Sequence, residues 1–575
     1  MQWLQRWTPG LNQLRSYHAS WASKDIVAGI VLSTLLVPQG MAYAELAGLP
    51  AVTGLYTSIT CLVAYAIFGP SKILVLGPDS SLGPMIAATI LPLVTANGDP
   101  QKAIAYASVL ALFTGAIMVA AGAARAGFVA DLLSKPTILG YMNGLALTIL
   151  IGQLPKLLGF SVDADKFLGE LAGLFQGIVG GKVVPAAATI GILCLAVILV
   201  LKQWLPKVPA VLVAVLVGIA GSLAFSLADK GVKVVGTLPQ GIPAPSIPLV
   251  PLSDLVLLFL GALGISLVAL TDTISNATSF AERRGEEVDG DREMIGIGAA
   301  NIAAGLFQGF PVSTSSSRTA VAEQSGARTQ VTGLVGAGVI LVMLLALPGL
   351  FADLPQPVLG AVVIAASVSL ADIGGWVRLW HQRRTDFAIS IAAFAGVVLL
   401  GVLPGIALAI GMSVVNVFRR AWMPHQAILG KVPDLAGLHD TEMYPSAQLL
   451  PGCTVFRFDG PLIFANSSTF RDKVRALAAA QEGPGWIIIA AEPMTDVDTT
   501  ACDMLDDLAA ALEAKGTRLV FAELKDPVRA KLRQYGLEPD IPEDRFYPTI
   551  NKAVAAYRET TGTDWVDPPT VSPAM

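Results

Sequence analysis

The sequence predicts a polytopic α-helical membrane domain followed by a small α/β domain. Only 14% of the 575 residues are charged, whereas soluble domains carry about 25%. Apolar runs recur from about Ile26 to Val417. One of them, Val183 to Leu201, carries no charge, and as a helix it would span roughly 28 Å, about one hydrocarbon core. Past Arg420, strand-like and helix-like segments alternate, which is typical of an α/β domain.

We expect about fourteen membrane spans within residues 25–420, after a cytoplasmic segment at 1–24. The uncharged run at 387–418 is too long for one crossing, and Pro404-Gly405 divides it. The expected spans are 26–46, 52–69, 74–95, 102–122, 132–152, 183–202, 208–228, 253–279, 294–308, 314–325, 330–348, 355–371, 386–402 and 404–418.

The loops predict the orientation. With the N-terminus inside, the arginines between spans all fall in cytoplasmic loops, while the opposite loops contain scattered lysines and no arginine. This bias follows the positive-inside rule. We therefore expect a multi-pass protein of the inner (plasma) membrane with both ends cytoplasmic. The first 25 residues lack the continuous apolar core of a signal peptide.

Several classes of chemistry are disfavoured. The four cysteines and four histidines are scattered, so neither a disulfide framework nor a zinc site is indicated. No pair of carboxylates with catalytic spacing stands out. We expect no enzyme activity, no cofactor, no bound metal of the zinc type and no nucleic-acid partner.

Two apolar segments are broken at matching places. In the third expected span, Gly77-Pro78 is followed by Asp79, Ser80 and Ser81. In the tenth, Gly309 and Pro311 precede five hydroxyl residues and a cation, Ser313 to Arg318. Breaks seven spans apart in a total of about fourteen predict two inverted seven-span repeats whose discontinuous helices build a site at mid-membrane.

Charge counting favours an anion at that site. Each helix N-terminus offers unpaired N–H groups and about +0.5 elementary charge, and a guanidinium adds one more. Hydroxyl groups can donate to oxyanion oxygens. We expect the substrate-binding groups to be Ser80, Ser81, Ser315, Ser316, Ser317 and Arg318. The alternative is an interfacial loop whose arginine faces lipid headgroups.

Four stretches resemble the SulP family of sulfate permeases, kin to pendrin and prestin. They are "VPQGMAYAELAGLPAVTGLYTS", "LGPDSS", "SSSRTAVAEQSGARTQ" and "MTDVDTTACDML". The resemblance covers nearly the whole chain. It implies a fourteen-span inverted repeat with core and gate subdomains, a C-terminal STAS domain and a homodimer. It also implies that Gln39 and Tyr43 of the first span line the site, beside Ser315, Ser317 and Arg318.

Three polar residues are candidates for cation coupling. Asp79 departs from the vertebrate relatives, which carry an apolar aromatic there, and the resemblance links the position of Asp272 to proton or sodium coupling. Asn276 lies one turn after Asp272, on the same helix face. If both acids are ionised they cancel the positive charge of the site, so loading one with H⁺ or Na⁺ restores anion binding. Structural hydrogen bonding is the alternative role for each acid.

The α/β domain is expected at residues 436–562, after a linker at 421–435 and before a disordered tail at 563–575. The resemblance implies that Thr500 matches a phosphorylatable position of STAS regulators. A helix cap at Asp498-Thr499-Thr500 explains the same residues. We expect this domain to serve dimer contacts, trafficking or partner docking.

The sequence thus predicts a secondary active transporter of oxyanions, with sulfate preferred and H⁺ or Na⁺ as the coupled ion. Its partners would be the anion, the cation, the lipid bilayer and a second copy of the chain. An uncoupled exchanger or channel for bicarbonate, chloride or dicarboxylates is the main alternative, and a receptor built on a transporter fold is another.

Overall fold

A computed structural model describes residues 8–94, 99–127, 134–162, 164, 166–205, 208–433, 435–481, 483–537 and 541–563. The chain forms two compact units, Met1–Ser413 and Val414–Met575, which we describe separately. The first is almost entirely helical. The second contains a six-stranded sheet.

Most α-helices of the first unit lie at the expected spans. They are α2 (Pro9–Arg15), α3 (Ala22–Leu46), α4 (Ala51–Phe68), α5 (Gly83–Ile90), α6 (Pro100–Ala123), α7 (Lys135–Leu157), α8 (Phe167–Val179), α9 (Pro185–Trp204), α10 (Ala210–Phe225), α11 (Leu255–Glu282), α12 (Gly290–Leu306), α13 (Ser316–Gln324), α14 (Val331–Ala346), α15 (Gln356–Leu370), α16 (Ile373–Gln382), α17 (Arg384–Leu400) and α18 (Val402–Trp422), which runs on into the second unit. Short 3-10 turns occur at Ala19–Trp21, Leu91–Leu93, Leu227–Lys230 and Leu252–Asp254.

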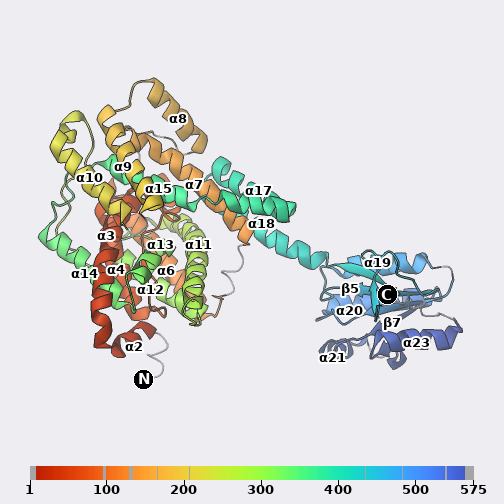
Figure 1. The fold of residues 1–575 in the computed structure, drawn as a ribbon. Coiled ribbons are helices and arrows are strands. Elements are labelled where there is room, and N and C mark those ends of the chain that lie inside the picture. Colours follow the sequence, from red (N-terminus) through yellow and green to blue (C-terminus); the bar gives the residue numbers. More distant parts are fainter. Residues whose placement is uncertain are drawn as a thin grey trace, which may run out of the picture. The chain divides into compact units, whose positions relative to one another are not determined.

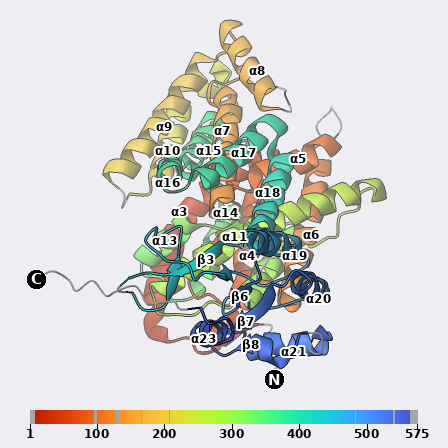
Figure 2. The same ribbon diagram turned by 90° about the vertical axis from the view of Figure 1, so that its right-hand side faces the viewer.

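The helices pack in two groups, visible in both ribbon views (Figures 1 and 2). One contains α3, α4, α6, α11, α12 and α14, and the other contains α7, α9, α10, α15 and α17. Contacts between α3 and both α10 and α15 join the groups. This division agrees with the two subdomains that the family resemblance implies.

Within the described residues, eight helices are long and apolar enough to cross a membrane, and four more are apolar but shorter. The number fourteen and the inverted repeat stay predictions. Helices α2, α8 and α16 lie outside the spans that we expected. Exposed apolar residues such as Ile192, Val256 and Val342 are what a lipid-facing surface requires.

The second unit is a sheet with helices on both faces. Its strands are β3 (Gln426–Lys431), β4 (Leu438–Asp440), β5 (Cys453–Phe458), β6 (Trp486–Ala490), β7 (Arg518–Ala522) and β8 (Phe546–Tyr547), in the order β4-β3-β5-β6-β7-β8. Its α-helices after α18 are α19 (Ser467–Ala479), α20 (Thr499–Glu513), α21 (Asp526–Gln534) and α23 (Ile550–Thr561), with a 3-10 turn at Glu543–Arg545.

Side chains of β6 alternate between two apolar cores, as a strand that is covered on both faces requires. Ile487 and Ile489 pack in the core that contains residues of α19, α20 and α21. Ile488 packs in the other, with Val554 and Tyr557 of α23. Strands β5 to β8 are parallel, and β3 is antiparallel to β5.

The sheet begins earlier than the sequence predicts. We placed a linker at 421–435, yet β3 lies inside it and pairs with both β4 and β5. The domain therefore includes residues before 436. The predicted disordered tail lies outside the described residues from 564 onward.

Candidate functional site

The two broken segments meet, as predicted. Strand β1 (Leu76–Gly77) pairs antiparallel with β2 (Ser313–Thr314). Each short strand leads into a short helix, β1 into α5 after five residues and β2 into α13 after one. Gly77 permits the approach, because a Cβ there would stand 3.1 Å from Nη1 of Arg318. The breaks thus bring two helix N-termini to one place inside the bundle.

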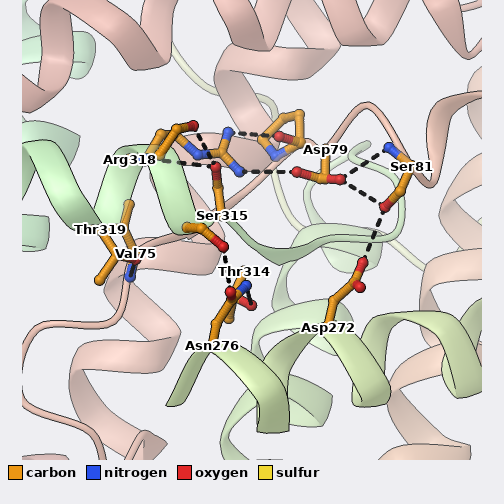
Figure 3. A network of polar contacts seen from close by, with 12 residues as sticks. Val75, Asp79, Ser81, Asp272, Asn276, Thr314, Ser315, Arg318 and Thr319 are labelled. Carbon is orange, nitrogen blue, oxygen red and sulfur yellow. Dashed lines mark hydrogen bonds and ion pairs between the residues drawn. The ribbon is translucent and has the colours of Figure 1, made fainter. Parts of the chain in front are cut away.

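Arg318 holds these two segments together. Its side chain is fully buried, and Nη1 donates to the carbonyl oxygen of Pro78 at 2.6 Å. Nη2 lies 3.9 Å from Oδ1 of Asp79 (Figure 3). Within the described residues, Nε and Nη2 have no hydrogen-bond acceptor. A buried guanidinium with unused donors is suited to an anionic ligand.

Asp79 is an ion-pair partner of Arg318, which the sequence did not reveal. Its other oxygen, Oδ2, accepts from the Ser81 N–H at 2.9 Å and from the Ser81 hydroxyl at 2.7 Å. Both carboxylate oxygens of Asp79 are thus engaged, one with the guanidinium and the other with two donors of Ser81. The charge of Asp79 and the charge of Arg318 therefore offset each other.

Helix α11 contacts both broken segments through residues one turn apart. Oδ2 of Asp272 lies 3.2 Å from the Ser81 hydroxyl. Nδ2 of Asn276 donates to Oγ1 of Thr314 at 2.9 Å, and its Oδ1 accepts from the Ser316 hydroxyl (Figure 3). Asn276 thus fixes the start of α13, while Asp272 faces the residues before α5.

The remaining expected binding residues lie on α3, before α5 and at the start of α13. Tyr43 and Ser80 are both buried, and Gln39, one turn before Tyr43 on α3, is half-buried. Ser315 caps α13 by accepting from the Arg318 backbone N–H at 3.5 Å, and its hydroxyl lies 3.1 Å from that of Ser317. The side chains of Ser316 and Ser317 are exposed.

The structure adds residues that the sequence did not single out. Oγ1 of Thr319 accepts from the Val75 N–H at 3.1 Å and so strengthens the contact between the two segments. Tyr141 and Thr137 of α7, from the other helix group, line a narrow cleft with Asp272. Thr319 stands one residue after the hydroxyl run, next to Arg318. Nothing local marks Tyr141, because its place in the cleft depends on packing between distant helices.

Comparison with known proteins identifies the family of the chain. The Sulfate permease family matches residues 23–393, and the STAS domain matches residues 444–553. The chain belongs to the sulfate permease family. Membership makes it a multi-pass membrane anion transporter with a STAS domain, and not an enzyme.

Relatives support the assignment along the whole chain. A probable sulfate transporter of Mycobacterium tuberculosis is 40% identical over 96% of this chain and 98% of its own length. Sulfate transporter 1.3 of Arabidopsis thaliana is 28% identical over 94% of this chain and 85% of its own. The solved structure of the murine anion transporter Slc26a9 in the inward-facing state has a TM-score of 0.88 at 24% identity, covering 96% of this permease and 94% of that chain. That likeness concerns the fold.

In the STAS domain of the permease, the cap at the start of α20 is formed by Asp498. Its Oδ1 accepts from the Ala501 N–H at 2.8 Å, and its Oδ2 accepts from the Phe464 N–H at 2.7 Å. Nearby, a hydrogen bond from Lys531 holds the pKa of Asp496 below its usual value. Thr500 is exposed, so its hydroxyl stays accessible and its role as a switch stays a prediction.

We expect Asp498→Ala to destabilise the start of α20 by about 1–2 kcal/mol, because it removes the N-cap and the anchor of Phe464. Hydrogen exchange on the full-length permease would show faster exchange at the first amides of α20. Thr500→Ala is the matched control and should leave these rates nearly unchanged. Equal rates in wild type and Asp498→Ala would contradict this role.

Proposed function

We propose that this permease is a sulfate transporter that couples anion uptake to H⁺ or Na⁺ through Asp272. The observation that carries the proposal is the link from Asp272 through Ser81 to the Asp79–Arg318 pair, at the meeting point of two helix N-termini. Relatives that are named as sulfate transporters support sulfate as the anion.

The charges explain why coupling follows. The two helix ends together contribute about +1, and Asp79 cancels Arg318. An ionised Asp272 then brings the centre to about zero, while a neutralised Asp272 leaves about +1. A cation that loads Asp272 therefore raises the affinity for sulfate, and by linkage sulfate raises the affinity for the cation.

The binding groups proposed for sulfate are those that converge at this centre. Besides Arg318, we assign to the site the hydroxyl groups of Ser315, Ser316 and Ser317, the polar groups of Gln39 and Tyr43, and the residues Ser80 and Ser81. Helix N-termini and neutral hydroxyls suit a doubly charged oxyanion, because both can donate hydrogen bonds to its oxygen atoms. Alternating access would move this centre relative to the second helix group, which contributes Tyr141.

Two further features are part of the proposal. The arginine bias of the loops supports a cytoplasmic N-terminus and STAS domain in the inner (plasma) membrane. A homodimer is proposed from the family resemblance. Residues 25–420 would form the transport domain of each copy.

Uptake into proteoliposomes tests the coupling. We expect an inward H⁺ or Na⁺ gradient to drive accumulation of labelled sulfate, and Asp272→Asn to lose that accumulation while keeping sulfate counterflow. Asp254→Asn is the control, because Asp254 lies just before the same helix and binds Tyr106 away from the site. Accumulation that ignores both gradients would instead favour an uncoupled exchanger.

A further inference from the structure

The hydroxyl of Ser81 lies between two carboxylates. It stands 2.7 Å from Oδ2 of Asp79 and 3.2 Å from Oδ2 of Asp272 (Figure 3). Ser81 is only 1% exposed, so bulk water does not reach it to supply a further hydrogen. The same Asp79 oxygen also accepts from the Ser81 N–H at 2.9 Å.

A hydroxyl group has one hydrogen to donate, and here two acceptors compete for it. If both acids are ionised, one of them faces the lone pairs of Ser81 at hydrogen-bond distance, which is repulsive. If Asp272 is protonated, its O–H donates to Ser81 and the Ser81 O–H donates to Asp79. Every member of the chain is then satisfied. Asp79 already faces Arg318 and accepts from the Ser81 N–H, so we assign the proton to Asp272.

We propose that Ser81 is the positioning residue through which protonation of Asp272 is transmitted to the Asp79–Arg318 pair. This inference rests on the proposed function and selects the proton as the coupled ion. When Asp272 releases its proton to solvent, the Ser81 hydroxyl turns toward the new carboxylate. Asp79 then loses the hydroxyl donor, keeps the Ser81 N–H, and draws Arg318 closer. The guanidinium is then less available to the anion, so deprotonation weakens sulfate binding without any direct contact between Asp272 and sulfate.

The other charged groups near α11 are engaged elsewhere. Asp272 faces Asp79 across Ser81 and Tyr141 of α7 in the narrow cleft, where α18 contributes the apolar Ile406 and Ala409. Of the ionisable residues of α6, Lys102 is exposed and Tyr106 donates to Asp254. Those of α12 have partners of their own: Asp291 accepts from the Gly127 N–H, Arg292 pairs with Asp289, and Glu293 accepts from Tyr65 and Ser71. Asp272 is therefore the titrating group that Ser81 can sense.

The test is the pH dependence of sulfate affinity. Initial uptake of labelled sulfate into proteoliposomes, with equal pH on both sides, would give the apparent KM between pH 5.5 and 8. In the wild-type permease we expect KM to rise with pH. In Ser81→Ala, Asp79 lacks the hydroxyl donor at every pH, so KM at low pH should be about tenfold higher. KM should also rise less steeply with pH than in wild type, because only the direct charge effect of Asp272 is left.

Two further variants make the test specific. Ser81→Cys keeps a weaker donor and should show an intermediate pH profile, and it decides the question if Ser81→Ala does not fold. Ser266→Ala is the matched control. Ser266 is also a buried serine and donates to the Thr114 carbonyl at 3.4 Å, away from the site; its loss should leave the profile unchanged.

The outcomes separate this inference from the proposed function. A wild-type KM that depends on pH only while Asp272 is present, together with an unchanged profile in Ser81→Ala, would overturn the role of Ser81 and leave proton coupling standing. A wild-type KM that does not change with pH, with uptake driven by Na⁺ alone, would overturn the proton as the coupled ion. An absence of any coupling would overturn the proposed function itself.

Discussion

Replacement of Arg318 by alanine is expected to reduce sulfate transport at least about a hundredfold, in counterflow as well as in gradient-driven uptake. The side chain is fully buried and donates to the Pro78 carbonyl. Its loss leaves Asp79 without a countercharge beside a site that must hold an anion. Removal of one partner of a buried ion pair costs about 3–5 kcal/mol, so the protein should also be less stable.

A double variant separates these two effects. In Arg318→Gln combined with Asp79→Asn, neither residue carries a charge and the two side chains can still hydrogen-bond, so much of the lost stability should return. Transport should not return, because the site has lost its cation. Stability can be followed in detergent by the reactivity of the cysteines, since Cys61 and Cys194 are both buried. Sulfate transport by Arg318→Ala at the wild-type KM would refute this role.

Arg318→Lys tests the geometry of the cation. An ammonium keeps the charge, but it cannot present the planar fork that reaches Pro78 and Asp79 together while leaving donors unused. We expect transport between that of wild type and that of the alanine variant. The contrast distinguishes a site that needs positive potential alone from one that needs the guanidinium.

Local features of the sequence predicted most of the membrane domain. Uncharged runs define the helices, and Gly77-Pro78 and Gly309 with Pro311 predicted the two breaks, since both residue types interrupt helices for local reasons. The structure confirms that these breaks meet in the β1–β2 pair. The alternation of strand-like and helix-like segments past Arg420 likewise predicted the α/β domain.

Features that depend on long-range contacts could not be predicted in this way. Asp79 and Arg318 are far apart in the sequence, and neither position indicates the ion pair. The hydrogen bond between Ser81 and Asp272 is equally distant in sequence. Strand β3 was missed because "QAILGK" is short and its apolar residues do not alternate regularly with polar ones. Its place in the sheet comes from pairing with β4 and β5.

Asp25 illustrates the same limit, because its neighbours on both sides in the sequence resemble an ordinary helix start. The structure shows a fully buried carboxylate at the beginning of α3. It accepts from the backbone N–H groups of Arg328 and Thr329 at 2.6 and 3.2 Å. It also accepts from the hydroxyls of Thr329 and Thr332 at 2.8 and 3.0 Å. Asp25 thus joins α3 to the turn between α13 and α14.

We expect Asp25→Ala to destabilise the membrane domain by about 3–5 kcal/mol, because four donors lose their acceptor inside the protein. Asp25→Asn should cost only about 1 kcal/mol: its oxygen can keep the three hydrogen bonds made to Oδ1, and the Thr329 hydroxyl can turn to accept from the amide. Thermal unfolding in detergent, followed by cysteine reactivity, measures both.

The exposed Asp229 provides the control, since a surface substitution such as Asp229→Ala should change stability by less than about 0.5 kcal/mol. The order of stability among the three variants separates the effect of charge from that of the hydrogen bonds. If charge alone mattered, Asp25→Asn would be as damaging as Asp25→Ala. If the hydrogen bonds position the turn, the stability of the asparagine variant should stay close to that of wild type. It should also keep transporting sulfate, because the first turn of α13 still places Arg318 opposite Pro78. An alanine variant as stable as the Asp229 control would show that the turn is held by other contacts.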